Sequence, residues 1–158
     1  MWKAIKPYVI SIAIALGVGA LSAYFTRDSM DIYSYIVKPP LAPPSILFPI
    51  VWTILYTLMG ISSAYVYVNR KRNPEAATNG LFAYASSLVV NFFWSLIFFN
   101  MQNFLFAFIW LILLWILIIV TIINYYKVSP VSAYLQIPYL LWVTFAGYLT
   151  LMIYLLNG

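Results

Sequence analysis

The sequence predicts an all-α integral membrane protein, a bundle of five transmembrane helices. Hydrophobic residues make up 65% of its 158 residues and charged residues only 7%, with a mean hydropathy of +0.96. A soluble domain carries roughly a quarter charged residues. Charged and turn-forming residues also divide the chain into five apolar blocks. Each block is close to the length of about 20 residues that a helix needs to cross a bilayer.

The five predicted helices form a single domain over residues 1–158. The breaks between them read "TRDSMD", "NRKRNPE", "NMQN" and "KVSP". Asn73–Pro74 and Ser129–Pro130 are typical helix starts, because an N-cap residue precedes a proline at the first helical position. The expected helices cover residues 6–25, 47–68, 76–100, 104–126 and 131–156.

The first block could instead be a signal peptide, since lysines precede an apolar run. That run is long for a signal peptide and "ALSA" is a loose cleavage match, so a retained first helix is favoured.

With five spans, six Lys and Arg lie in the segments on the same side of the membrane as the N-terminus, and two lie in the segments on the opposite side. This bias predicts a cytoplasmic N-terminus and a C-terminus outside. The six are Lys3, Lys6, Arg70, Lys71, Arg72 and Lys127, and the two are Arg27 and Lys38.

The loop between the first two helices contains "KPPLAPP", residues 38–44. Proline fixes φ and biases the residue before it away from the helical region, so we expect a stiff, extended connector. Such a proline-rich loop can act as a lid over a cavity between helices. Trp52, about one turn into the second helix, then has two interpretations. It is a residue of the aromatic belt at the headgroup level, or it is a wall of the cavity beneath the lid.

The third block places Ser87, Asn91 and Ser95 on one helix face, at i, i+4 and i+8. An asparagine in hydrocarbon needs a hydrogen-bond partner, because no water is there to solvate it. Asn91 could join helices by hydrogen bonding across them. It could also donate into a ligand cavity beside Trp94, or the face could pair two protomers. The spacing leaves these alternatives open.

The last block carries an aromatic stripe with one small residue in it. Trp142, Phe145, Ala146 and Leu149 fall at i, i+3, i+4 and i+7, which is one face of a helix. Such a stripe more often packs against other helices than forms a site. The small side chain of Ala146 nevertheless leaves the room that a pocket requires.

The composition excludes several classes of function. The chain has no cysteine and no histidine, so disulfides, thiolate chemistry and histidine-based metal sites are absent, and no metal is expected. The only acids, Asp28, Asp31 and Glu75, lie in predicted loops, which argues against ion-coupled transport. No Walker or Rossmann loop is present. The scattered net charge of +5 indicates membrane topology rather than nucleic-acid binding.

What remains is an aromatic cavity with a few neutral polar groups. Such a cavity suits a large, flat, apolar ligand, because stacking and burial give affinity and a few hydrogen bonds fix orientation.

Four motifs in order, "KPPLAPP", "FPIVWTILYTLMG", "NFFWSLIFF" and "IPYLLWVTFAGYL", resemble the TspO/MBR family, which includes the mitochondrial translocator protein. The resemblance covers nearly the whole chain. It implies a five-helix bundle, often a homodimer in bacteria, with a pocket closed by the loop after the first helix. It also implies binding of porphyrins such as protoporphyrin IX and haem, of sterols, and of isoquinoline carboxamides and benzodiazepines.

The resemblance implies that ligand-binding residues come from the loop and three helices. Trp52 and Trp142 would also be the catalytic pair of a light-dependent enzyme that degrades porphyrin. The full expected set is Tyr33, Pro43, Phe48, Trp52, Asn91, Trp94, Trp142, Phe145, Ala146 and Leu149.

Two departures from the family pattern are visible. The family's loop often reads Lys-Pro-x-Trp-x-Pro-Pro, but Leu41 stands at the tryptophan position. The cholesterol motif of animal members needs a Lys or Arg after its tyrosine, and none follows Tyr154. Such motifs are weak patterns in any case, and sterol binding is not predicted as the native role.

Three functions follow in order of preference. The first is a membrane receptor or binding protein for porphyrins and drug-like apolar ligands. The second is light-dependent porphyrin degradation, and the third is porphyrin or sterol transport. No cofactor is required, and the expected partners are a tetrapyrrole or similar small molecule, membrane lipid and a second copy of the chain.

No targeting presequence is recognisable, and the loops resemble those of bacterial members of the family. The expected location is therefore a bacterial plasma membrane.

Overall fold

The computed structural model describes residues 1–29 and 31–157, and every regular element in these ranges is helical. Five helical segments are long and apolar enough to cross a membrane, which confirms the predicted fold class. The five are α1 (Trp2–Thr26), α3 (Leu47–Val68), α4 (Pro74–Ser95) with its extension η2 (Leu96–Asn100), α5 (Phe104–Val128) and α6 (Pro130–Asn157), and the short elements are α2 (Ile32–Tyr35) and the 3-10 turn η1 (Arg70–Arg72).

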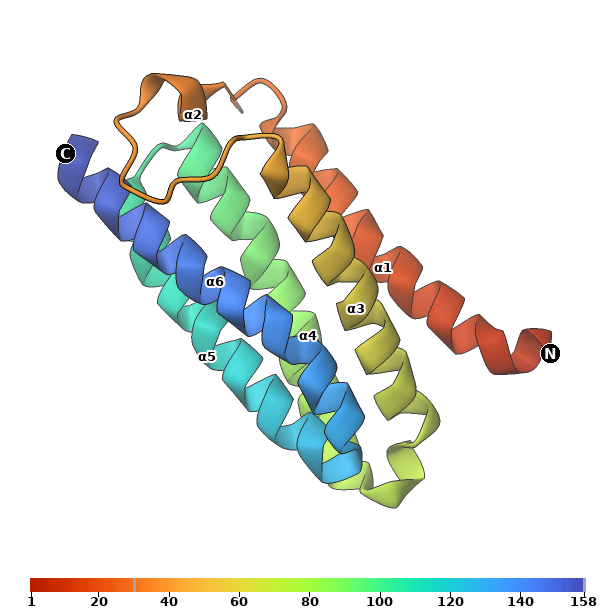
Figure 1. Ribbon diagram of the computed structural model, residues 1–158. Coiled ribbons are helices and arrows are strands. Elements are labelled where there is room, and N and C mark those ends of the chain that lie inside the picture. The colour runs from red at the N-terminus through yellow and green to blue at the C-terminus, as the bar shows by residue number, and fades with distance from the viewer. Residues whose placement is uncertain (30, 158) are drawn as a thin grey trace.

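The long helices lie side by side in one bundle (Figure 1). α5 packs against α4 and α6, while α3 packs against α1 and α6. α1 is the most peripheral helix, and only Ala15, Ser22 and Thr26 of its described residues are buried. The C-terminal end of α6 lies near the loop that follows α1, and the N-terminus lies at the other end of the bundle (Figure 1).

The predicted helix start at Asn73–Pro74 has N-cap chemistry, and Asn103 adds a cap that was not predicted. Asn73 precedes Pro74, and its side-chain oxygen accepts a hydrogen bond from the Ala76 N–H at 3.2 Å. Asn103 caps α5 in the same way, accepting from the Phe106 N–H at 3.1 Å. Each cap satisfies one of the N–H groups that the first turn of a helix leaves without a partner.

The end of the third span is not α-helical. Residues Leu96–Asn100 form a π turn in which the Met101 N–H donates to the Leu96 carbonyl at 3.0 Å. The sequence predicts an uninterrupted helix to residue 100. Single π turns within helices are rare and often occur at functional sites. Here the turn places Phe98 and Phe99 against the cavity described below.

Residues 31–46 form the lid. The "KPPLAPP" stretch within it has no helix, as expected, whereas the short helix α2 before it was not predicted. A turn runs from Pro39 to Ala42, with the Ala42 N–H donating to the Pro39 carbonyl at 3.3 Å. Leu41 in this turn has φ of 73°, in the left-handed region that favours glycine.

α1 and α3 approach closely at one glycine. A Cβ atom on Gly60 would lie 2.6 Å from the Ile12 Cα, which is backbone and cannot rotate away. Small residues at such crossings let membrane helices gain van der Waals contact. Gly60 therefore sets how near α1 lies to the rest of the bundle.

We expect Gly60→Ala to destabilise the protein, because the added methyl group must push α1 away. Overpacking costs about 1–3 kcal/mol, more than the roughly 1 kcal/mol that alanine gains over glycine in a helix. Thermal unfolding in detergent, followed by circular dichroism, should show a lower Tm. Gly17→Ala is the matched control, since a Cβ there meets nothing within 4 Å. Equal Tm values for the two variants would contradict the close contact.

Candidate functional site: an aromatic cavity beneath the lid

A cavity of about 340 Å³ lies near the lid, lined by α1, α3, α4, η2, α6 and the lid itself. This volume falls within the range of small-molecule sites, roughly 300–1,000 Å³. No charged side chain is among the lining residues, whereas aromatic side chains are prominent. The aromatic lining residues are Tyr33, Phe48, Trp52, Tyr56, Trp94, Phe98, Phe99 and Trp142.

α3 forms one wall of the cavity. Phe48, Trp52 and Tyr56 all line it and follow one another at intervals of four residues. The Trp52 ring stacks on Tyr56, with centroids 5.5 Å apart and planes at 29°, and meets the edge of Tyr139 at 6.3 Å. Both contacts are inside the bundle. Trp52 is therefore a wall of the cavity rather than a belt residue facing lipid headgroups.

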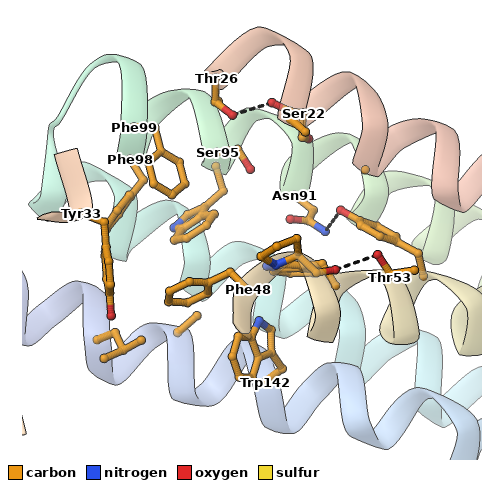
Figure 2. Close-up of a pocket in the computed structure, with 18 of the residues that line it drawn as sticks. Ser22, Thr26, Tyr33, Phe48, Thr53, Asn91, Ser95, Phe98, Phe99 and Trp142 are labelled. Atoms are coloured by element: carbon orange, nitrogen blue, oxygen red, sulfur yellow. Dashed lines mark hydrogen bonds between the residues drawn. The ribbon is translucent and has the colours of Figure 1, made fainter. Parts of the chain in front are cut away.

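Asn91 connects three helices beside the cavity. Its Nδ2 donates to the Tyr56 hydroxyl at 3.1 Å on α3 and to the Tyr139 hydroxyl at 3.4 Å on α6. Figure 2 shows the Asn91 amide at the edge of the cavity, which Phe48 and Trp142 also line. Asn91 both joins helices and lines the cavity. The alternative that this face pairs two protomers is wrong, because Asn91 and Ser87 are buried within the chain itself.

α6 forms a second wall, but the predicted stripe divides into two parts. Trp142, Ala146 and Leu149 line the cavity, whereas Phe145 does not. The Phe145 ring instead packs between Trp142, at 5.6 Å, and Tyr148, at 6.1 Å. Phe145 thus supports the wall from behind rather than facing the cavity.

The lid contributes one aromatic side chain to the cavity. Tyr33 lines it, and the Tyr33 ring meets the Phe48 ring edge-on at 5.2 Å. Its hydroxyl donates to the Pro43 carbonyl at 2.7 Å. Burial raises the pKa of Tyr33 above its ordinary value, so the hydroxyl keeps the proton that this bond needs. Pro43, expected in the ligand-binding set, braces the lid in this way and is not part of the lining.

Two side chains of α6 fasten the lid from the other side. The Tyr148 hydroxyl donates to the Pro40 carbonyl at 2.8 Å. The Asn157 amide makes two bonds with Val37: it accepts from the Val37 N–H at 2.9 Å and donates to the Val37 carbonyl at 2.9 Å. The lid is therefore held to the last helix at Val37 and at Pro40.

Several lining residues were missed by the sequence analysis. Tyr56 follows Trp52 by four residues, and Ile153 follows Leu149 by four, so helical spacing alone could have added both. The residues from α1 carry no such signal, because apart from Leu16 they are small or weakly polar. The α1 contribution is Leu16, Gly19, Ala20, Ser22, Ala23 and Thr26.

The cavity is least enclosed where α1 faces α3. Ala20 and Ala23 on α1, and Pro49 and Thr53 on α3, line the cavity and are also exposed. Both helices face lipid over much of their length. The lining thus reaches the surface of the bundle on the side that contacts the bilayer.

The chemistry available in the cavity is limited to stacking, apolar burial and neutral hydrogen bonds. Within residues 1–29 and 31–157 no three His, Cys, Asp or Glu side chains come together as a possible metal site. Indole and phenol rings are the redox-capable groups that face the cavity. An apolar, planar molecule is the kind of ligand that this lining favours.

These features define a polytopic α-helical membrane protein with an internal aromatic cavity closed by a loop. The sequence profile of the TspO/MBR family matches residues 11–156, and the chain belongs to this family. It is 38% identical to the tryptophan-rich protein TspO of Chlorobaculum tepidum over 99% of both chains. It is also 38% identical to the TspO of Archaeoglobus fulgidus over 95% of this chain and 96% of the relative. The translocator protein of Bos taurus shares 33% identity over 83% of this chain and 78% of its own.

We expect Asn157→Ala to loosen the lid, because two hydrogen bonds to Val37 are lost. At about 1 kcal/mol for each hydrogen bond, the lid should open roughly five- to thirtyfold more often. Hydrogen–deuterium exchange of a peptide covering residues 36–46 would measure this. Asn124→Ala is the control, since the Asn124 amide bonds to Val120 within its own helix. We call the bonds of Tyr148 and Asn157 to the lid the latch. Unchanged exchange in Asn157→Ala would show that the latch does not hold the lid.

Proposed function

We propose that this protein is a membrane receptor for porphyrins, such as protoporphyrin IX and haem, and for other large apolar ligands including isoquinoline carboxamides and benzodiazepines. One observation carries the proposal: eight aromatic side chains from four elements and the lid line a cavity without any charged group. Planar aromatic ligands gain from offset and edge-to-face contacts with such rings, about 0.5–1.5 kcal/mol for each pair beyond the area buried. Membership of the TspO/MBR family supports the same ligand class.

A few polar groups are placed to orient the ligand. Asn91 lines the cavity, and the Trp94 indole N–H and the Ser22 hydroxyl are buried without a hydrogen-bond partner among the described residues. An unpaired buried donor costs about 1–3 kcal/mol. A ligand carbonyl or carboxylate that reaches either group removes this cost. Such a ligand would bind better than a hydrocarbon of the same shape.

A second function is favoured by the two tryptophans. Trp52 and Trp142 line the same cavity, and Trp52 contacts the rings of Tyr56 and Tyr139. A photoexcited porphyrin bound there could take one electron from an adjacent indole, which gives a porphyrin radical anion and an indole radical cation. Opening of the porphyrin ring would then use dioxygen as the oxidant. Light-dependent degradation of the bound porphyrin is therefore the alternative that we propose to test alongside binding. No cofactor is needed for either function.

The location and orientation follow from the charges. We propose a bacterial plasma membrane, with the N-terminus cytoplasmic and the lid outside. The six Lys and Arg of the N-terminal side lie in the first turns of α1, in η1 and at the end of α5. These places share the end of the bundle remote from the lid (Figure 1). The positive-inside bias then orients the whole chain. A homodimer is proposed from the family resemblance, through a face other than that of Ser87 and Asn91.

We expect Ala146→Leu to weaken protoporphyrin IX binding at least tenfold. Ala146 lines the cavity, so the added carbons occupy the space of the ligand. Equilibrium titration by quenching of tryptophan fluorescence would give the Kd. The control is Ala85→Leu, at an exposed position on α4 outside the lining. Equal Kd values in the two variants would place the binding site elsewhere.

We expect Trp52→Phe/Trp142→Phe to separate binding from photochemistry. Phenylalanine keeps much of the apolar contact, so porphyrin should still bind in the dark. If the indoles take part in the reaction, loss of the porphyrin Soret band under light should fall at least tenfold in the double variant. Bleaching at the same rate with wild type, the double variant and no protein would exclude the enzymatic alternative. Absence of saturable binding in the dark would exclude the receptor.

A further inference from the structure

The lid has two different faces. Tyr33 is turned to the cavity, and the lid backbone is fastened to α6 at Val37 and Pro40. Large apolar side chains of the lid do not line the cavity and remain exposed: Leu41 at 80%, Tyr35 at 78%, and also Val37 and Ile46. We call these four residues the outer lid face. Neither the cavity nor the latch accounts for their apolar character.

Leu41 is the most exposed of the four and carries a conformational cost. Its φ of 73° lies in the left-handed region, which is unfavourable for an L-residue with a Cβ atom. Glycine would avoid this cost in a turn of this kind. Transfer of a leucine side chain from water to an apolar medium is favourable and can offset this cost. Leucine is thus compatible with this backbone if its side chain lies in an apolar medium.

The outer lid face is continuous with a lipid-facing stripe. Ile46, Ile50 and Ile54 follow one another at i, i+4 and i+8 and are all exposed. The last two belong to α3, a membrane-spanning helix, so this stripe faces hydrocarbon. Ile46 is both the end of the stripe and part of the lid. The lid also joins the ends of two spans, which is the level of the bilayer interface, and Tyr35 is a residue type enriched at that level.

The charges near the lid fit a lipid without net charge. Arg27 and Lys38 are balanced by Asp28 and Asp31. Both cations are also held by the protein: the Lys38 Nζ donates to the Tyr33 carbonyl at 2.8 Å, and an Arg27 N–H donates to the Tyr24 carbonyl at 2.7 Å. No excess positive charge is left to select an anionic headgroup. Apolar burial is the interaction that this surface offers.

We propose that the outer lid face is a lipid-binding surface, which inserts Tyr35, Val37, Leu41 and Ile46 into the boundary between headgroups and acyl chains of a zwitterionic phospholipid leaflet. The leaflet is that of the same bilayer which the five helices cross. The lid is then held between the latch residues of α6 on one side and lipid on the other. This inference is independent of which ligand occupies the cavity.

A single spin label tests the proposal, because the chain contains no native cysteine. Leu41→Cys, carrying a nitroxide, is reconstituted in phosphatidylcholine bilayers. Power saturation compares collisions with oxygen, which concentrates in lipid, and with a water-soluble nickel chelate. Ile54→Cys on the lipid-facing stripe and Lys71→Cys in η1 are the lipid and water references. We expect the oxygen-to-nickel ratio at position 41 to exceed that at position 71 at least threefold.

Two outcomes would overturn the proposal. A ratio at position 41 equal to that at position 71 would place the outer lid face in water. Spin–spin broadening that disappears on dilution with unlabelled protein would mean that a second copy covers the face. Ile46→Cys repeats the measurement at a second exposed position, so one altered turn cannot decide the result. The five-helix fold of each variant is checked by circular dichroism.

Discussion

The hydrogen bonds of Asn91 are the interaction on which the cavity depends. An amide in hydrocarbon must find partners, and here both partners are tyrosine hydroxyls on other helices, Tyr56 on α3 and Tyr139 on α6. The three helices are therefore fixed relative to one another beside the cavity. Trp52 packs on both of these tyrosine rings. The position of the Trp52 indole thus depends on the two hydrogen bonds that Asn91 makes.

The lid is the second constraint, and it is formed between distant parts of the chain. Tyr33 and Pro43 brace the lid from within, while Tyr148 and Asn157 hold it from α6. A proline-rich segment loses little conformational entropy when it is fixed in this way. Three hydrogen bonds to α6 and one within the lid therefore hold this largely irregular segment over the cavity.

The peripheral position of α1 completes this arrangement. α1 approaches α3 closely at Gly60 and, through Gly19, at Tyr56, yet most of its surface is exposed. Toward the lid it presents mostly small side chains, such as Ala20 and Ala23, to the cavity. α1 is held close to α3 where Gly60 meets Ile12. Near the lid, the small side chains of α1 leave the cavity bordered by lipid. That combination suits ligands that partition into membranes.

The five spans, the cap at Asn73 and the extended lid segment could be predicted from the sequence, because they depend on local properties: apolar length, N-cap chemistry and the fixed φ of proline. The sequence also indicated the faces of Trp52, Asn91 and Trp142 through helical spacing. Only the tertiary structure separated Phe145 from Ala146, introduced the π turn that places Phe98 and Phe99, and joined Asn157 to Val37. These features depend on contacts between residues far apart in the chain, where a few degrees of helix rotation decide which side chain faces the cavity. Helical spacing in the sequence identifies which face of a helix is turned to the cavity. Which residues of that face line the cavity depends on how the helices pack.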